Sequence, residues 1–305
     1  MGEFVHINDV GPRDGLQNQA SILSPSQRLQ LIQALLDAGV TAIEVGSFVS
    51  EKAVPAMAAT DTLFAALPDK DRVRYSVLAP TPRHYARAVQ AGARIIEVFV
   101  CATQSMNQRN VRASIAQSMA SAAEIAAMAA VDNVSIIAAV AVAWECPFEG
   151  RTDPQQVMDM TAQFFAMGVE RVVLADTIGA ANPQQVARLV ETLAQRHDID
   201  RLACHFHDTR AMGLANAYAA LSSGVRHFDA SVGGLGGCPF APGATGNVPT
   251  EDLVMMLHQM GYDTGIDLPA LMAAGSLAGE LTGTVTGGRA DRWRRLQLDK
   301  GKPLA

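Results

Sequence analysis

The chain has 305 residues, of which 49% are hydrophobic and 18% are charged, and its formal net charge is −6 at pH 7. This composition is typical of a globular protein with a large core. A negative net charge gives no long-range attraction for nucleic acid or for an anionic membrane surface, so neither is expected as a partner, and local arginines must bind any anionic substrate.

Neither secretion nor membrane insertion is predicted. We expect no secretory signal, because a basic stretch followed by an apolar segment is not seen near residue 1, and the most apolar run, 134–144, is too short to span a bilayer. The four cysteines are widely spaced and form no CxxC pair. We therefore expect a cytoplasmic protein with reduced cysteines.

Short β-branched runs alternate along the chain with longer stretches rich in Ala, Leu and Gln. The runs predict strands at 4–9, 42–45, 73–78, 95–100, 134–142, 171–174, 202–207 and 227–232. The stretches between them predict helices at 26–38, 82–91, 114–130, 154–167, 183–196 and 212–222. Helix-start signals such as Ser24-Pro25 and Asn182-Pro183, and a helix-ending glycine such as Gly39, support these boundaries.

Eight strands that alternate with helices, without a linker or a change in composition, predict a single-domain (β/α)8 barrel, a TIM barrel of the α/β class. An open, doubly wound sheet is the alternative. Segments 250–260 and 269–281 predict a closing helix and one extra C-terminal helix. We expect the catalytic barrel with its closing helices over 1–285, and a polar C-terminal tail, solvated rather than structural, over 286–305.

Polar side chains follow or end several predicted strands, where the chemistry of such barrels takes place. They are Arg13 and Asp14 after the first strand, Glu44 in the second, Asp176 ending the sixth, His205 and His207 ending the seventh, and Cys238 after the eighth. Structural alternatives exist: Asp14 could cap a turn, Glu44 could pair with a lysine at the rim, and a histidine could simply pack in the core. Convergence on one end of the barrel favours a functional site.

The pair His205 and His207 predicts a metal site. Alternate side chains on a strand share a face, so both imidazoles point the same way. With an aspartate they form a mixed nitrogen and oxygen set that suits Mg²⁺, Mn²⁺ or another divalent Lewis acid, whereas a structural zinc site is not indicated. Asn247 could add a carbonyl oxygen, although it is equally a turn former. Cys238, among four nearby glycines, predicts a reactive thiol on a loop able to close over the site.

These residues lie within longer strings that resemble the 3-hydroxy-3-methylglutaryl-CoA lyase family, one branch of a group of metal-dependent lyases and synthases built on the (β/α)8 barrel. The matching strings are 10–18, 43–44, 47–50, 146–150, 176–179, 205–209 and 231–252. The likeness is colinear over nearly the whole chain. The segment 234–239, Gly-Leu-Gly-Gly-Cys-Pro, is its most specific part and points to the lyases.

The resemblance implies roles for individual residues. Asp14, His205, His207 and Asn247 would hold Mg²⁺ or Mn²⁺. Glu251 would help to position these ligands without binding the metal itself. Arg13, Cys238, Glu44, Asp176 and His205 would be the catalytic residues. Substrate contacts would come from Arg13, Gln17, Ser47, Asn110 and Thr177.

The implied activity is cleavage of 3-hydroxy-3-methylglutaryl-CoA to acetyl-CoA and acetoacetate by retro-aldol type chemistry, as in leucine catabolism. An acyl-CoA is thus the expected partner, and a homodimer is left open. A condensing synthase of the same group and a non-catalytic barrel are weaker alternatives.

The chain departs from the family pattern mainly in one stretch. Ala139 and Ala141 stand where a tyrosine and a serine are usual, and Trp144-Glu145 replaces a small apolar pair. Thr103-Gln104 also stands where Ser-Glu is usual. Glu145 would either face the pocket or turn to solvent at the rim. The same chemistry on a related 3-hydroxyacyl-CoA, citramalyl-CoA or isohexenylglutaryl-CoA, is therefore the main alternative.

Overall fold

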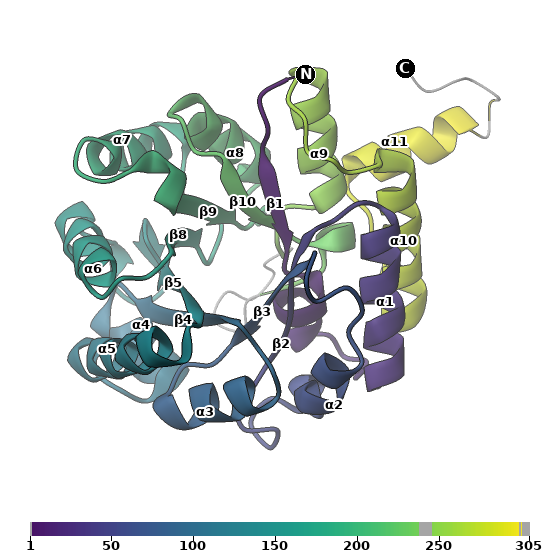
Figure 1. Ribbon diagram of the computed structural model, residues 1–305. Coiled ribbons are helices and arrows are strands. Elements are labelled where there is room, and N and C mark those ends of the chain that lie inside the picture. The colour runs from purple at the N-terminus through teal and green to yellow at the C-terminus, as the bar shows by residue number, and fades with distance from the viewer. Residues whose placement is uncertain (1, 238–245, 299, 301–305) are drawn as a thin grey trace.

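The central feature of the fold is a closed barrel of parallel strands (Figure 1). The structure is a computed structural model that describes residues 2–237, 246–298 and 300. The barrel strands are β1 (His6–Asp9), β2 (Ala42–Ser47), β3 (Arg74–Leu78), β4 (Ile95–Cys101), β5 (Ser135–Ala141), β8 (Arg171–Asp176), β9 (Leu202–Phe206) and β10 (His227–Ala230). Their order around the barrel is β1-β10-β9-β8-β5-β4-β3-β2. Two short strands, β6 (Glu145–Cys146) and β7 (Gly150–Arg151), pair antiparallel as a separate hairpin.

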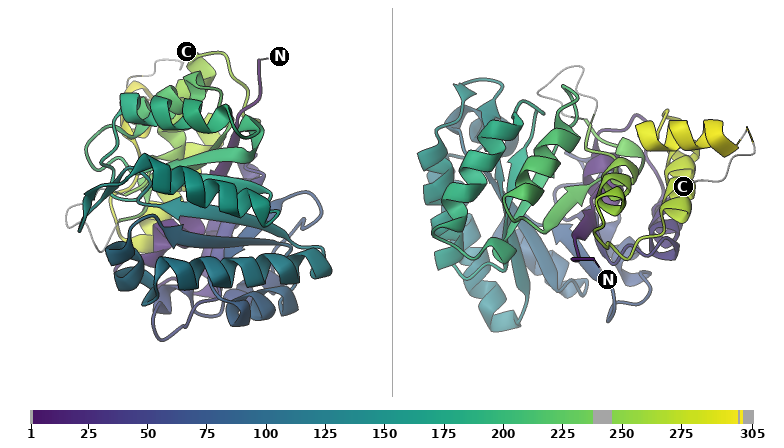
Figure 2. Two further views of the ribbon diagram at one scale, coloured as in Figure 1. Left: turned by 90° about the vertical axis from the view of Figure 1, so that its left-hand side faces the viewer. Right: turned by 90° about the horizontal axis from the view of Figure 1, so that it is seen from above.

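Helices surround the barrel on its outer side (Figures 1 and 2). They are α1 (Pro25–Asp37), α2 (Thr60–Ala65), α3 (Pro82–Gln90), α4 (Gln104–Val111), α5 (Ile115–Asp132), α6 (Pro154–Ala166), α7 (Pro183–Ala194), α8 (Gly213–Ser222), α9 (Thr250–Gln259), α10 (Leu268–Thr282) and α11 (Arg289–Leu298). A π-helical turn, η1 (Gly11–Gly15), follows β1, and 3-10 turns occur at η2 (Pro55–Met57), η3 (Ile199–Arg201) and η4 (Val232–Gly234). Over the described ranges no single helix is long and apolar enough to cross a membrane; α4 and α5 meet that test only as a pair, bent by 64°.

Local signals set the starts and ends of these helices. Before α1, Ser24 accepts a hydrogen bond from the backbone of Gln27, whose side chain accepts one from the backbone of Ser24. This capping box satisfies donors that the first turn leaves open. After α1, Gly39 has a φ of +89°, and a Cβ there would meet the carbonyl oxygen of Gly265, so the turn requires glycine.

The closed barrel confirms the predicted (β/α)8 architecture and its extra C-terminal helix, and it rules out the open, doubly wound sheet. The helices α2 and α4 were not predicted. Neither has a side-chain hydrogen bond at its N-cap: α2 starts from Ala59 in the left-handed region, and α4 ends at Arg112, also left-handed, rather than at a glycine. The sequence therefore carries no strong boundary signal for either helix.

The apolar core lies mainly between the strands and the surrounding helices, where side chains such as Leu31, Ile43 and Phe164 are fully buried. A smaller apolar cluster lies inside the barrel. It consists of Ala139 on β5, Val173 on β8 and Ala203 on β9, with Phe99 and Ile137 packed against it. Two of the three cluster members are alanines, which fill less of the barrel interior than large branched residues would.

The expected solvated tail over 286–305 is wrong for the segment that forms α11. Asp252 on α9 accepts hydrogen bonds from the backbone of Arg289 and Ala290, at 3.0 and 2.8 Å, and so caps the start of this helix. Ala290 is buried, and just before the helix the backbone of Gly287 donates a 2.9 Å hydrogen bond to the carbonyl of Gly233 in η4. The segment is polar in composition, and its first turn packs against α9, whereas Trp293 and Leu296 further along the helix are exposed.

Candidate active site

The predicted metal ligands meet at the carboxyl ends of the barrel strands. Asp14 lies in η1, His205 in β9 and His207 one residue beyond the end of β9, and each offers a potential ligand atom within 4.8 Å of the other two. The centroids of the two imidazole rings are 5.3 Å apart. The spacing of two residues therefore places both rings on one side, as predicted.

The turn η1 brings Arg13 and Asp14 over this end of the barrel. Its start is held by buried Asp9, which accepts hydrogen bonds from the backbone of Gly11 at 2.9 Å and from the hydroxyl of Thr250 at 2.7 Å. Asp14 does more than cap a turn. Its Oδ1 accepts a hydrogen bond from Arg13 at 2.8 Å, and its Oδ2 accepts one from Asn247 Nδ2, also at 2.8 Å.

The protonation states and open acceptors of this cluster fit a divalent cation. Burial alone would raise the pKa of Asp14, but Arg13 and the two histidines lower it to about 2, so the carboxylate is charged. Burial, and then His205, lower the pKa of His207 to about 4, so its ring is neutral. Asn247 Oδ1 and His207 Nδ1 are buried and have no hydrogen-bond partner among the described residues. A carboxylate, a neutral imidazole and an unpaired amide oxygen form a donor set for a divalent metal.

His205 is held by a carboxylate on the neighbouring strand. Its Nδ1 lies 3.2 Å from Oδ2 of Asp229 on β10, whose Oδ1 accepts a 2.9 Å hydrogen bond from Asn8 on β1. Burial would lower the pKa of His205, but the hydrogen bond and charge of Asp229 raise it overall. Since Nδ1 faces Asp229, Nε2 is the ring nitrogen left for a metal, an arrangement common among metal-binding histidines.

Arg13 and Glu44 form a buried ion pair next to the metal cluster. The Nη2 of Arg13 lies 2.6 Å from Oε2 of Glu44, and the Glu44 side chain is fully buried. Burial would lower the pKa of Arg13, but Glu44 and Asp14 raise it above its usual value, so the guanidinium stays charged. Glu44 therefore pairs with an arginine inside the barrel, and not with a lysine at the rim.

A pocket of about 160 Å³ opens beside these groups. Among the predicted substrate contacts, Arg13, Gln17, Asn110 and Thr177 line it, together with Asp14, His205 and His207. Ser47 and Asp176 are not in its lining. The Ser47 hydroxyl donates to the carbonyl of Leu78 at 3.3 Å, and the Asp176 carboxylate accepts the backbone hydrogens of Ala180 and Ala181. The contacts of Asp176 are those of a residue that shapes the loop after β8.

Glu251 supports the loop after β10 from within the core. Both of its carboxylate oxygens accept the backbone hydrogen of Gly233, at 2.8 and 3.1 Å. Burial raises the pKa of Glu251 to about 8. Cys238 follows on this loop and lies outside the described residues.

Of the positions that depart from the family pattern, Ala139 and Ala141 lie in the pocket and Glu145 lies at its rim. Ala139 and Ala141 line the pocket, beside Phe99 and Met106, so the missing tyrosine and serine leave an apolar wall. Glu145 does not line the pocket: its carboxylate lies 3.6 Å from the Arg210 guanidinium, and both side chains are well exposed. It is thus a rim residue.

Two acids of the site were not predicted. Asp229 on β10 and Glu97 on β4 both line the pocket and are at most 8% exposed. Each stands among apolar residues in a short strand, where a charged side chain is costly unless it has a partner. That exception to the strand pattern is the signal that could have identified them.

The comparisons agree with this geometry. The HMGL-like family model matches residues 4–278. The chain belongs to this family. It is 41% identical over 288 residues to the hydroxymethylglutaryl-CoA lyase of Pseudomonas mevalonii, which covers 94% of this chain and 96% of the relative. It is also 41% identical over 282 residues to the (R)-citramalyl-CoA lyase of Chloroflexus aurantiacus, covering 89% of each chain.

A solved member of the family has the same fold. The crystal structure of hydroxymethylglutaryl-CoA lyase from Pseudomonas aeruginosa superposes with a TM-score of 0.94 and 38% sequence identity, covering 97% of this chain and 99% of that one. The family relatives named here are all acyl-CoA lyases. The match extends over the barrel and beyond it, so the similarity concerns the whole fold and not a single motif.

Proposed function

We propose that this protein is a divalent-metal-dependent carbon–carbon lyase that cleaves 3-hydroxy-3-methylglutaryl-CoA to acetyl-CoA and acetoacetate by retro-aldol type chemistry. The observation that carries the proposal is the cluster of Asp14, His205 and His207 with the unpaired oxygen of Asn247, directly beside Arg13. A non-catalytic barrel would have no need of such a set. Relatives named as lyases favour cleavage over condensation.

A divalent cation bound by Asp14, His205, His207 and Asn247 would supply Lewis acidity toward the substrate oxygens and lower the pKa of its hydroxyl. Asp14 provides the negative charge of this ligand set, and Asp229 fixes the ring of His205. Mg²⁺ and Mn²⁺ are the proposed ions, because the donors are nitrogen and oxygen without a thiolate.

Arg13 is the proposed electrostatic catalyst. Its guanidinium lines the pocket and is held on two sides, by Glu44 at 2.6 Å and by Asp14 at 2.8 Å. In this place it can stabilise the negative charge that develops on the thioester oxygen as the carbon–carbon bond breaks. A preorganised donor of this kind is typically worth about 3–4 kcal/mol.

The cleavage also needs a proton for the carbon of the acetyl-CoA enolate. Cys238 is the proposed donor, with a histidine of the site, His205, as the alternative. Alkylation of Cys238 should inactivate the enzyme, and bound substrate should protect the thiol. Full activity of the alkylated protein would assign the proton donor to another residue.

A related substrate is the second candidate, supported by the apolar wall of the pocket. Ala139 and Ala141 offer neither an aromatic ring nor a hydroxyl to the acyl chain, and the neighbouring Phe99 and Met106 are apolar. Such a wall suits a bulkier or differently branched acyl group, as in isohexenylglutaryl-CoA or citramalyl-CoA. Sequence identity does not separate the candidates, since the two lyase relatives are equally similar.

An assay of the purified protein decides between these candidates. The three thioesters are supplied in turn with Mg²⁺ or Mn²⁺, and acetyl-CoA release is compared as kcat/KM. Cleavage of none of them under either metal would overturn the proposed function. We also propose a cytoplasmic location, which the free, buried thiols of Cys146 and Cys204 support and which cell fractionation tests. A homodimer is proposed as well, and the mass of the native protein measured in solution tests it.

A further inference from the structure

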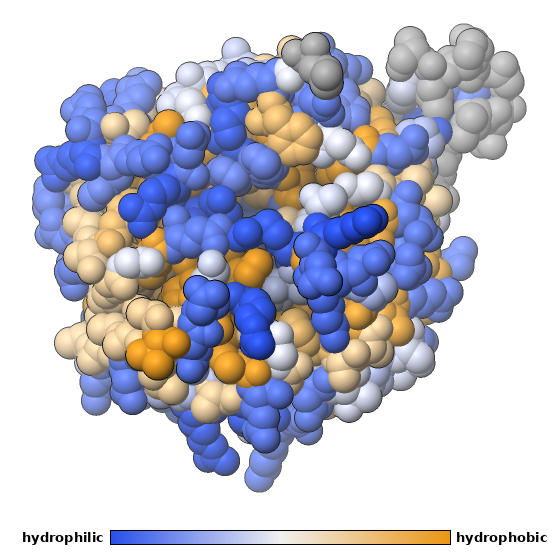
Figure 3. Space-filling model, viewed as in Figure 1, coloured by the Kyte–Doolittle hydropathy of each residue, from blue (hydrophilic) through white to orange (hydrophobic). Residues whose placement is uncertain are grey.

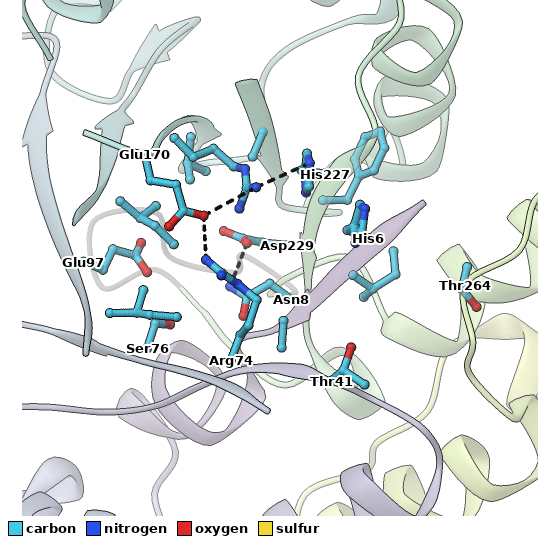
Figure 4. Close-up of a pocket in the computed structure, with 18 of the residues that line it drawn as sticks. His6, Asn8, Thr41, Arg74, Ser76, Glu97, Glu170, His227, Asp229 and Thr264 are labelled. Atoms are coloured by element: carbon cyan, nitrogen blue, oxygen red, sulfur yellow. Dashed lines mark hydrogen bonds and ion pairs between the residues drawn. The ribbon is translucent and has the colours of Figure 1, made fainter. Parts of the chain in front are cut away.

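A second cavity, of about 340 Å³, lies at the opposite end of the barrel from the metal cluster (Figure 4). The first residues of several strands line it, among them His6, Arg74, Arg171 and His227, so it lies at the amino-terminal end. On the face seen in Figure 3, hydrophilic side chains surround the centre and apolar ones are visible between them. Glu97, Val173 and Asp229 line both this lower cavity and the active-site pocket, so one layer of side chains separates them.

Glu97 is the unexplained member of that layer. Three alternate residues of β4 face the barrel interior. Ile95 lines the lower cavity, Phe99 lines the active-site pocket, and Glu97 lies between them and lines both. Glu97 is only 5% exposed and points into the cavity from one wall in Figure 4. A carboxyl group between two apolar neighbours on a buried strand requires a partner.

The partner of Glu97 is a second carboxyl group, that of Glu44. The two side chains lie within hydrogen-bond reach of each other. Apart from the Arg13 ion pair, the Glu44 oxygens have no hydrogen-bond donor in the described part of the chain. Two adjacent buried carboxylates repel each other, and a shared proton both removes one charge and supplies the missing donor.

We propose that Glu97 is a protonated carboxylic acid that donates a hydrogen bond to Glu44 and thereby positions the Arg13–Glu44 pair. The electrostatics agree: burial, and then the charge of Glu44, raise the pKa of Glu97 well above its usual value. Burial also raises the pKa of Glu44, although Arg13 lowers it, so the surroundings of both carboxyl groups favour one proton shared between them.

The charges around Glu97 favour the neutral form. Asp229 on β10 adds a further negative charge, whereas Arg13 is engaged by Glu44 and Asp14. The other titratable groups that line the lower cavity are Arg74, Glu170, Arg171, His6 and His227. Arg74 and Arg171 both lie near Glu170, at 2.5 and 3.7 Å, so Glu170 partly balances their charge.

The predicted effect on catalysis rests on the proposed function, whereas the protonation of Glu97 does not. Infrared spectroscopy detects a buried protonated carboxyl group directly, without substrate. We expect the Glu97→Gln protein at pH 7 to lack one carboxylic acid band of the wild type. As the matched control, Glu170→Gln changes an acid of the same cavity whose ion pairs are with Arg74 and Arg171, and it should leave that band in place. Retention of every band in Glu97→Gln would overturn the proposal.

Turnover of the cleaved thioester provides the second test. Glutamine can still donate to Glu44 but cannot ionise, so Glu97→Gln should keep kcat near the wild-type value and move the alkaline limb of its pH profile to higher pH. Glu97→Val removes the donor and should lower kcat by about 10- to 100-fold, the scale of a small misplacement of a catalytic group. KM and Mn²⁺ affinity should change little. Equal activity of Glu97→Val and wild type, or an unmoved alkaline limb in Glu97→Gln, would contradict the positioning role.

Discussion

Asp229 and His205 are register partners on neighbouring strands, and the carboxylate of the first lies 3.2 Å from Nδ1 of the second. The same register continues one strand further, where Asn8 pairs with Asp229 and donates a 2.9 Å hydrogen bond to its other oxygen. Three adjacent strands thus hold one imidazole in a fixed tautomer and orientation. This arrangement positions the ring before any ligand arrives.

The Asp229→Asn substitution should weaken metal binding. The amide keeps the shape of the side chain but removes the charge that holds Nδ1–H of His205, and supports of this kind are worth about 10- to 100-fold in metal affinity. Mn²⁺ titration followed by electron paramagnetic resonance measures the change. Asp159→Asn, which changes an exposed residue of α6, is the control and should bind as the wild type does. An unchanged affinity in Asp229→Asn would contradict the positioning role.

The His207→Ala substitution should abolish turnover while the barrel stays folded. It removes the neutral imidazole of the ligand set, and no other described His, Cys, Asp or Glu joins Asp14 and His205 in the cluster. Circular dichroism checks the fold, and activity is measured after chelation and addition of Mg²⁺ or Mn²⁺. If His207→Ala retained near wild-type activity under these conditions, the ligand assignment would be wrong.

Arg13→Lys should not restore function. The guanidinium contacts Glu44 and Asp14 at once, and a lysine ammonium cannot hold both while it faces the substrate. We expect a large fall in kcat with a modest change in KM, as for a group that acts mainly in the transition state. Steady-state kinetics with the cleaved thioester provide the test, and an effect mainly on KM would make Arg13 a binding residue instead.

Glu251 should make stability depend on pH. Its pKa is about 8 in the folded protein, against an ordinary value of 4.5, so between these values the folded state binds more protons than the unfolded state. This contribution is fully present below pH 4.5 and is lost as the pH rises through about 8. Urea unfolding of metal-free Glu251→Gln should therefore show a smaller loss of stability over this range.

The exposed residue Glu280 on α10 provides the matched control for that measurement. Glu280→Gln should retain the wild-type pH dependence. Identical slopes of unfolding free energy against pH in Glu251→Gln and wild type would show that Glu251 does not carry the effect.

Ala139→Tyr should shift the substrate preference toward 3-hydroxy-3-methylglutaryl-CoA. The new ring and hydroxyl would reduce the volume beside Phe99 and Met106 and add a donor for the polar acyl terminus. The ratio of kcat/KM for this thioester and for isohexenylglutaryl-CoA is the measurement. A wild type that already strongly prefers the methylglutaryl substrate over every analogue would exclude the pocket argument.

The order of strands and helices could be predicted from the sequence because the barrel is built from repeated local signals. Runs of β-branched residues and caps such as Ser24 and Asn182 act within a few residues of each element. The start of α11 depends instead on Asp252, far earlier in the chain. A contact between distant segments leaves no local pattern, so the sequence pattern does not predict this helix.

The residues of the site also differ in whether local sequence signals or contacts between distant segments determine their roles. Asp14, His205 and His207 could be found because their spacing and motifs are local, and the structure brings them together. The roles of Glu97 and Asp229 depend on which strands are neighbours across the barrel and on the stagger between them. Ser47, expected to bind substrate, and Asp176, expected to be catalytic, both bind backbone groups in the structure, and a sequence motif does not reveal such contacts.

Gly233 is tied at both of its backbone groups, its N–H to Glu251 and its carbonyl to the N–H of Gly287. The base of the loop that leads to Cys238 is therefore anchored by a residue that lies beyond the barrel in the sequence. A boundary drawn at 285 would cut through this anchor and leave both the carbonyl of Gly233 and the carboxylate of Asp252 without their partners. Residues 287–290 are thus tied to the barrel by direct hydrogen bonds, so truncation at 285 is expected to loosen the base of this loop.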